Sequence, residues 1–270
     1  MKLKTIFVVW FVASSLCLPA QKTVKIWGET GSRNQKWSEL TVFLPEKPHP
    51  SGISVIICPG GSYYWLDMNN EGFLVAKHLN RQGITAFVLK YRTAKRGNCH
   101  PAMIQDLERA MQMVKTNSSE LGINPEKVGI MGFSAGGHLA GTAAIYSETA
   151  LKPYFVAMIY PVVSMQDSIC HKKSRKNLLG KNDSAELKKT MSLEENVYAG
   201  MPPLFLLHCM DDKTVDYRNS VVLDKALTEK KVSHKFLLFD KCGKNGHGFG
   251  IQPVKNAAGW IDEFLNWIYQ

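Results

Sequence analysis

The chain has 270 residues, 45% of them hydrophobic, and a formal charge of +10. This length allows one large α/β domain or two small ones, and the apolar content is ordinary for a globular protein with a buried core. The charge does not indicate nucleic-acid binding, because no nucleic-acid-binding motif accompanies it. No internal repeat or low-complexity tract interrupts the sequence.

The first twenty residues have the pattern of a cleavable export signal. Lys2 and Lys4 precede an apolar run over 6–18, and Leu18-Pro19-Ala20 forms a small-residue cleavage site. The run is too short to span a bilayer. We therefore expect cleavage after Ala20, a secreted or periplasmic product, and no membrane insertion.

Beyond residue 20, short apolar runs alternate with helical patterns, which is typical of a mostly parallel sheet covered by helices on both faces. The expected strands are 24–27, 40–44, 55–58, 85–91, 127–132, 155–163, 204–209 and 235–239, with the first two as candidates for an antiparallel start. The expected helices are 71–81 (with Asn69 as a candidate cap), 101–121, 137–144, 216–230 and 253–268. Residues 164–200 form an irregular, basic insertion. No linker divides the chain, so we predict one α/β domain over 21–270.

Residues 132–136 read Gly-Phe-Ser-Ala-Gly, between an expected strand and an expected helix. Gly-x-Ser-x-Gly in this setting is the nucleophile elbow of α/β hydrolases, which exposes a serine at a strained turn. The five-residue pattern is short enough to arise by chance, so its setting between strand and helix carries the argument. Ser134 is therefore the candidate nucleophile.

A serine hydroxyl becomes an effective nucleophile only when a base removes its proton. In the α/β-hydrolase order, the acid and then the histidine follow the serine. Only His234 and His247 follow the strand at 204–209. His234 opens an apolar strand, which favours a structural or surface role. His247 lies in a glycine-rich loop after the last strand and is the predicted base.

The acid belongs in the loop after the strand at 204–209, where Asp211 and Asp212 both qualify. Asp212 begins an Asp-x-x-Val pattern seen at this place in many such hydrolases, so we favour it and expect Asp211 to be an exposed loop carboxylate. The acid would hold the tautomer of His247 and stabilise its imidazolium form.

Acyl transfer also needs N–H donors for the developing oxyanion. The N–H of Ala135 follows the nucleophile directly. The N–H groups of Gly61 and Ser62 stand in Pro59-Gly60-Gly61-Ser62-Tyr63, where esterases carry a glycine-rich oxyanion loop. An ordinary turn is the alternative explanation of this segment.

Three further residues are candidates for substrate binding. Tyr63 and Trp65 would line the pocket, although aromatic core or surface positions explain them equally well. Glu71 would touch substrate, or serve only the electrostatics of a helix start. His138, one turn beyond Ser134, is expected to pack beneath the elbow.

The six cysteines, Cys17 included, are too scattered for a disulfide framework. Cys58 and Cys209 end apolar strands and are expected to be small buried side chains. Cys99 with Cys170 is a candidate bridge. Zinc-binding spacings are absent from the sequence, and we expect neither a metal nor a cofactor.

Much of the basic excess falls in the insertion. A solvated face explains it most simply, and attraction to an acidic polysaccharide is the sharper alternative. The residues are Lys172, Lys173, Arg175, Lys176, Lys181, Lys188 and Lys189.

Together these motifs resemble the secreted bacterial acetylxylan-esterase-like α/β hydrolases of the BD-FAE type, some of which are labelled xylanases, lipases or feruloyl esterases. The matching segments span nearly all of the chain after the signal: 58–63, 71–72, 89–92, 100–102, 131–140, 174–175, 178–180, 211–215 and 247–250. Two positions depart from the pattern: Ser62 replaces a glycine and Asp216 replaces a frequent proline.

The resemblance implies the α/β-hydrolase fold and hydrolysis of esters, commonly O-acetyl groups on plant polysaccharides, by Ser134, Asp212 and His247. The partner would be an acylated carbohydrate. A feruloyl or general carboxylesterase, a non-catalytic carbohydrate-binding protein and an exopeptidase are the alternatives. Whether 164–200 is a lid or a spacer stays open.

Overall fold

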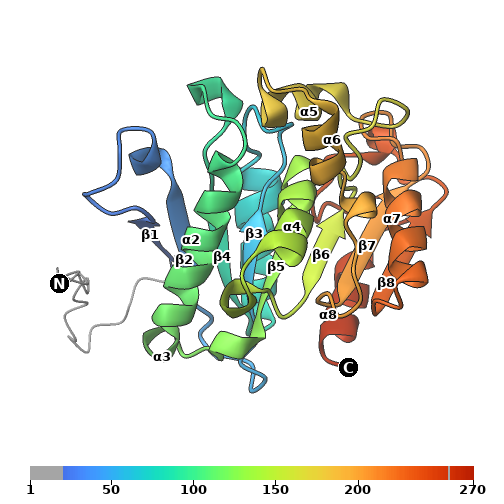
Figure 1. Cartoon of the computed structure of the whole chain (residues 1–270). Helices are drawn as coiled ribbons and strands as arrows, with labels where there is room; N and C mark the ends of the chain where they lie inside the picture. The colour runs from blue at the N-terminus through green and yellow to red at the C-terminus, as the bar shows by residue number, and fades with distance from the viewer. Residues whose placement is uncertain (1–20, 255) are drawn as a thin grey trace.

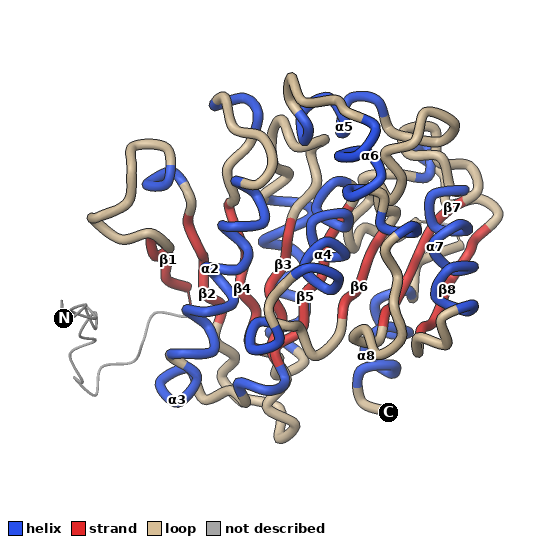
Figure 2. Tube along the Cα trace, viewed as in Figure 1, coloured by secondary structure: helices blue, strands red, loops and turns tan. Residues whose placement is uncertain are grey.

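The computed structural model describes residues 21–254 and 256–270, so the expected export signal at 1–20 lies outside the described residues. The centre of the fold is an eight-stranded sheet with the order β1-β2-β4-β3-β5-β6-β7-β8 (Figures 1 and 2). The strands are β1 (Gln21–Lys25), β2 (Glu39–Phe43), β3 (Ser54–Cys58), β4 (Thr85–Lys90), β5 (Val128–Phe133), β6 (Val156–Ile159), β7 (Leu204–Cys209) and β8 (His234–Phe239). β2 pairs antiparallel with both β1 and β4, and the other five pairs are parallel, which confirms the predicted class.

Helices cover both faces of the sheet. They are α1 (Leu74–Arg81), α2 (Ala102–Thr116), α3 (Ser118–Leu121), α4 (Ala135–Tyr146), α5 (Lys172–Leu179), α6 (Ala185–Met191), α7 (Arg218–Glu229) and α8 (Trp260–Ile268). Short 3-10 turns lie at Gln35–Trp37, Ala94–Arg96, Pro125–Lys127, Thr149–Leu151, Leu193–Glu195 and Lys244–Gly246, and a π-helical turn at Asn69–Phe73 precedes α1. Figure 1 shows α2, α4 and α7 on one face.

The core consists of two apolar layers, one on each face of the sheet. Successive side chains of a strand point to opposite faces. In β3, Ile56 and Cys58 therefore join the layer under α2 and α4, whereas Val55 and Ile57 join the layer under α1 and α8. Both layers consist of buried side chains, which explains why the central strands read as continuous apolar runs rather than as alternating ones.

Several predicted elements are shorter than expected. The helix predicted over 101–121 breaks at Asn117, whose side chain donates a hydrogen bond to the carbonyl of Met113. β6 ends at Ile159, before Pro161, because proline has no N–H to donate to a neighbouring strand. The last helix begins at Trp260 instead of 253. Asn69 caps no helix, because it opens the π-helical turn.

The insertion at 164–200 is ordered and carries α5 and α6, so its description as irregular is corrected. It lies beyond the carboxyl ends of the strands (Figure 1). The Asn177 side chain donates to the carbonyl of Ser62 at 2.8 Å, and the His100 N–H donates to the carbonyl of Leu178 at 2.7 Å. α5 is thus attached to the loop that follows β3.

One disulfide, Cys209–Cys242, joins the end of β7 to the loop after β8. Cys58 and Cys209 are buried, as predicted, but the disulfide of Cys209 was not foreseen. The candidate bridge between Cys99 and Cys170 was wrong, because both are free thiols. The parallel register that pairs Cys209 with Phe239 brings the loop at 242 beside the end of β7. Among the described helices, none combines the length and apolar character needed to cross a membrane.

Candidate active site

Ser134 occupies a sharp turn between β5 and α4. Its backbone has φ 53° and ψ −120°, a left-handed conformation that costs free energy for any residue other than glycine. A Cβ at Gly132 would lie 2.1 Å from the carbonyl oxygen of Gly136, and a Cβ at Gly136 would lie 2.0 Å from that of Cys58. Both glycines of the elbow are therefore required by close backbone contacts.

Three side chains that are far apart in sequence meet at this turn. His247 Nε2 lies 2.9 Å from Ser134 Oγ, and His247 Nδ1 lies 2.7 Å from Asp212 Oδ2. Asp212 follows β7 and His247 follows β8, and both strands end at the same edge of the sheet as β5. The arrangement lets the imidazole accept the serine proton while the carboxylate holds its other nitrogen.

Asp212 is held by four hydrogen bonds. Oδ1 accepts the N–H groups of Thr214 and Val215 at 2.8 and 2.9 Å, and Oδ2 accepts His247 and His208. Burial raises the pKa of Asp212 more than any other single influence, but the hydrogen bonds from both histidines outweigh it and leave that pKa below its ordinary value. The carboxylate therefore stays ionised.

His208 is a site residue that the motifs did not identify. It is fully buried in β7, with Nε2 3.1 Å from both Asp212 Oδ2 and the Val215 carbonyl. Because both neighbours are acceptors, Nε2 carries the proton, and Nδ1 accepts the Ser220 hydroxyl at 2.7 Å. Its position four residues before the acid, inside an apolar strand, was the only available signal.

The other acid and histidine candidates have structural surroundings. The expectation that Asp211 is an exposed loop carboxylate was wrong. Asp211 is partly buried and accepts the N–H groups of Cys242 and Gly243, so it supports the loop that carries His247. His234 Nε2 lies 3.0 Å from Asp224, away from Ser134.

The predicted oxyanion donors lie beside the serine. Gly61 and Ser62 line a pocket together with Ser134 and His247, and Ala135 begins α4. Within 21–254 and 256–270, the N–H groups of Gly61, Ser62 and Ala135 have no hydrogen-bond acceptor. Three amide donors are thus left for a ligand oxygen.

The oxyanion loop is strained. Gly61 has φ 136°, and a Cβ there would lie 2.0 Å from the carbonyl oxygen of Trp65, so only glycine fits. Ser62 and Tyr63 both have φ 57°, in the left-handed region. The contact from Asn177 to the Ser62 carbonyl holds this turn from the side of α5.

The structure corrects one of the three substrate-binding candidates. Tyr63 is fully buried and its hydroxyl lies 2.8 Å from His138 Nδ1, so it belongs to the core and not to the pocket wall. His138 packs beneath the elbow, as predicted, with Nε2 2.7 Å from the Met191 carbonyl. Burial lowers the pKa of His138 to about 4. Trp65, half exposed, lines the pocket.

Glu71 also lines the pocket, but its carboxylate is bonded to protein groups. Oε2 accepts the Gly60 N–H at 2.7 Å, and Oε1 accepts the Tyr160 hydroxyl at 2.9 Å. The Tyr160 oxygen in turn accepts the Gly250 N–H at 2.9 Å, and the Tyr160 ring centroid lies 4.6 Å from that of His247. Burial above all raises the pKa of Glu71 to about 7, despite the opposing influence of His247 and the hydrogen bonds.

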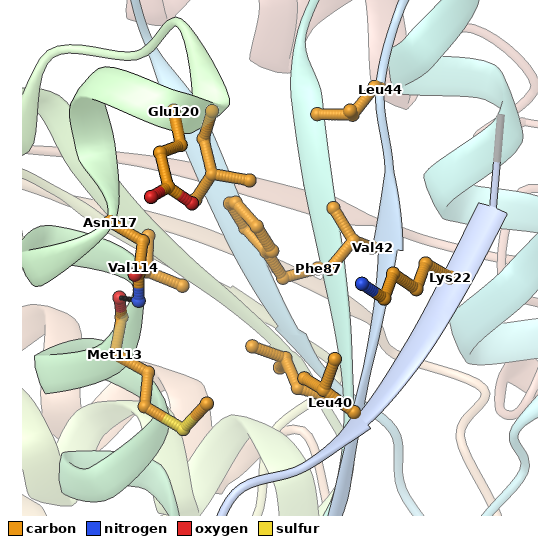
Figure 3. A pocket seen from close by; sticks show the side chains of 11 residues that line it. Lys22, Leu40, Val42, Leu44, Phe87, Met113, Val114, Asn117 and Glu120 are labelled. Atoms are coloured by element: carbon orange, nitrogen blue, oxygen red, sulfur yellow. Dashed lines mark hydrogen bonds between the residues drawn. The ribbon is translucent and has the colours of Figure 1, made fainter. Parts of the chain in front are cut away.

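The pocket at Ser134 is small, about 140 Å³, and its lining residues are Gly61, Ser62, Trp65, Asp67, Glu71, Ser134, Thr214, His247 and Gly248. Figure 3 shows a separate cavity of about 110 Å³ between β1, β2, β4 and α2. Phe87, Leu40 and Met113 line that cavity, which contains no serine, cysteine or histidine, so it offers no group for acyl transfer.

Part of the basic cluster in the insertion is neutralised locally. Arg175 binds Asp167 at 2.5 Å, and Lys188 lies 3.4 Å from Asp183. These pairs favour the interpretation as a solvated face.

Comparison with known proteins adds to this geometry. The sequence model of the BD-FAE family matches residues 40–227. The chain is 33% identical over 233 residues to an acetylxylan esterase of Xylanibacter ruminicola, covering 83% of this chain and 48% of that protein. It is 31% identical over 219 residues to endo-1,4-beta-xylanase B of Butyrivibrio fibrisolvens, covering 76% of this chain and 34% of the relative. The chain thus spans half or less of these relatives.

A solved structure is similar over nearly its whole length. The acetyl ester-xyloside bifunctional hydrolase from Caldicellulosiruptor lactoaceticus superposes with a TM-score of 0.83 at 28% identity, covering 95% of this chain and 98% of that one.

Proposed function

We propose that this chain, which belongs to the BD-FAE family of α/β hydrolases, is a serine esterase. It would remove small acyl groups, chiefly acetyl, from carbohydrates. The observation that carries the proposal is the contact series from Ser134 through His247 to Asp212, beside three N–H groups that have no acceptor among the described residues. Similarity to an acetylxylan esterase and to an acetyl ester-xyloside hydrolase supports the substrate class.

The reaction would follow from the geometry in two steps. His247 Nε2 accepts the proton of Ser134 as Oγ attacks the ester carbonyl, and the N–H groups of Gly61, Ser62 and Ala135 stabilise the oxyanion. His247 then protonates the leaving sugar hydroxyl. In the second step His247 activates a water, which cleaves the acyl-serine and restores the free hydroxyl.

The pocket favours a small acyl group. Its volume of about 140 Å³ suits an acetyl group better than a feruloyl group, which carries an aromatic ring. The second candidate function is that of a feruloyl or general carboxylesterase. It requires that larger acyl groups extend out of the pocket past Trp65. We further propose an exported protein, because the disulfide Cys209–Cys242 is typical of oxidising compartments and agrees with the signal pattern at 1–20.

The test compares the natural protein with Ser134→Ala on p-nitrophenyl acetate, acetylated xylan and methyl ferulate. We expect acetate release by the natural protein and a loss of at least about 10³-fold in kcat for the variant, as removal of a catalytic serine typically causes. Labelling of Ser134 by a fluorophosphonate should disappear in the variant. A protein that neither reacts with the probe nor hydrolyses any of the three esters would be a binding protein on a hydrolase fold.

A further inference from the structure

A second cleft adjoins the pocket at Ser134. Its volume is about 490 Å³, within the usual range of ligand sites. Trp65 lines both cavities, so the cleft begins where the pocket ends. The lining residues come from the turn before β2, the segment after the oxyanion loop, and the end of β4 with the turn after it: Trp37, Tyr64, Trp65, Leu66, Met68, Lys90, Thr93, Lys95 and Arg96.

Two neighbouring aromatic rings are exposed in this cleft. Tyr64 is 43% exposed and Trp65 is 50% exposed, whereas the flanking Tyr63 is buried and the flanking Leu66 is partly buried. Single exposed aromatic residues need no explanation, but adjacent rings at the rim of a cleft indicate a contact surface. The C–H face of a sugar ring packs on an aromatic face, whose electron density is negative.

The cleft also holds positive charge that has no carboxylate partner among the described residues. Lys90 binds Glu39 at 2.8 Å, a carboxylate that Lys25 also binds. Within the described chain, neither Lys95 nor Arg96 has a carboxylate within 4.0 Å, and both are exposed. The Arg96 guanidinium is held 3.2 Å from the centroid of the Trp37 ring. Cation–π contact of this kind orients the guanidinium and leaves its N–H groups available.

The chemistry of these groups selects a ligand. A guanidinium presents its N–H groups as a planar fork that matches a carboxylate, and a cleft with apolar walls strengthens the attraction. A neutral carbohydrate would use Tyr64 and Trp65 but would leave Lys95 and Arg96 unpaired. A carbohydrate unit that carries a carboxylate, such as a uronic acid, uses both sets.

We propose that this cleft is a subsite for a uronic-acid unit located next to the acylated sugar whose ester is hydrolysed at Ser134. The proposal rests on the proposed function, since it takes the acylated carbohydrate as the substrate. Tyr64 and Trp65 pack on the sugar ring, and Lys95 and Arg96 bind the carboxylate. The subsite would direct the enzyme to acetyl groups close to acidic side units.

The test uses two acetylated oligosaccharides of equal length, one neutral and one with a single uronic acid. We expect about a tenfold higher kcat/KM for the acidic one, mostly through KM, because a charge-assisted hydrogen bond is stronger than a neutral one. Arg96→Gln should bring the ratio near one, with kcat on p-nitrophenyl acetate unchanged. Arg81→Gln, the same substitution at the exposed end of α1, is the matched control. Added salt should lower the ratio in the natural protein.

A binding measurement separates failure of this inference from failure of the proposed function. Titration calorimetry on Ser134→Ala with unesterified oligosaccharides does not depend on catalysis, and preference for the acidic one there would support the subsite even if no ester were hydrolysed. Turnover of p-nitrophenyl acetate together with equal use of both oligosaccharides would overturn the subsite and leave the esterase intact. Equally tight binding of an acidic peptide would overturn the carbohydrate assignment.

Discussion

Glu71 joins the two loops that flank the nucleophile. Its carboxylate binds the Gly60 N–H on the side of the oxyanion loop, and through the Tyr160 hydroxyl it reaches Gly250 on the side of the His247 loop. These partners donate hydrogen bonds to the carboxylate, but burial makes its charge costly. We therefore assign Glu71 a positioning role in place of direct substrate contact.

This position predicts a pH-dependent stability. Because burial raises the pKa of Glu71 from 4.5 to about 7 in the folded state, the folded protein binds this proton more tightly than the unfolded chain between those two values. The group's contribution is complete below pH 4.5 and is lost as the pH rises through 7. Because one pKa unit corresponds to about 1.4 kcal/mol, the free energy of unfolding falls by about 3 kcal/mol.

Glu71→Gln, which cannot ionise, should lack this loss. Urea unfolding at pH 4.5 and pH 8 measures it as a difference between the natural protein and the variant. Glu120→Gln replaces an exposed carboxylate and should keep the natural pH dependence. Identical pH dependence in all three proteins would show that Glu71 ionises as freely as a surface group.

His208 predicts a shift in the acid limb of activity. Its hydrogen bond is one of the influences that lower the pKa of Asp212, so removing it in His208→Leu should raise that pKa and move the acid limb of kcat/KM to higher pH. We expect a loss of about 10- to 100-fold at neutral pH, by analogy with groups that orient metal ligands. His208→Gln, with an amide donor, should recover part of the loss. An unmoved acid limb in the leucine variant would contradict the role.

At the scale of elements, local sequence predicted most strands well and the helix ends poorly. The first strand, expected over 24–27, is β1 at Gln21–Lys25. β7 matches its predicted range of 204–209 because all six residues are buried on both faces, which leaves a continuous apolar run between polar turns. α8 begins at Trp260, because the preceding segment forms turns that the helical spacing of its apolar residues does not reveal. α5 and α6 were missed because their polar, basic sequences carry only short apolar stretches.

The contact between α5 and the oxyanion loop gives the insertion a testable role. Asn177→Ala removes the hydrogen bond to the Ser62 carbonyl and with it about 1 kcal/mol of support for a left-handed turn. We expect kcat on p-nitrophenyl acetate to fall about tenfold while KM changes less than twofold, since the turn positions donors that act in the transition state. Asn182→Ala, an exposed asparagine just beyond α5, is the control. A change confined to KM would indicate that α5 acts as a lid over the substrate.

At the scale of the whole molecule, the sequence predicted the contacts that follow from the fixed order of catalytic residues along an α/β-hydrolase chain. The order of nucleophile, acid and histidine along the sheet led to Ser134, Asp212 and His247, which lie together. Contacts between segments that share no motif were not predictable. The placement of Tyr160 between Glu71 and Gly250 depends on the end of β6, and the pairing of two cysteines depends on the register of β7 and β8.

The disulfide connects the two loops that carry the acid and the histidine. Cys209 lies three residues before Asp212, and Cys242 lies five residues before His247, so the bridge limits how far the loops can separate. Closure of a loop over a sequence separation of 33 residues removes unfolded-state entropy worth about 4 kcal/mol in the chain-entropy treatment.

Replacing both cysteines by alanine should therefore lower the free energy of unfolding by about 2–4 kcal/mol, measured with urea, and reductant should lower that of the natural protein by a similar amount. In this double variant, activity on p-nitrophenyl acetate should be lost at a lower urea concentration than the circular-dichroism signal of the sheet, because the loops separate before the strands do. Cys99→Ala, which removes an exposed free thiol, should change neither quantity. If the double variant kept the natural stability and the two transitions coincided, the bridge would serve neither the fold nor the spacing of Asp212 and His247.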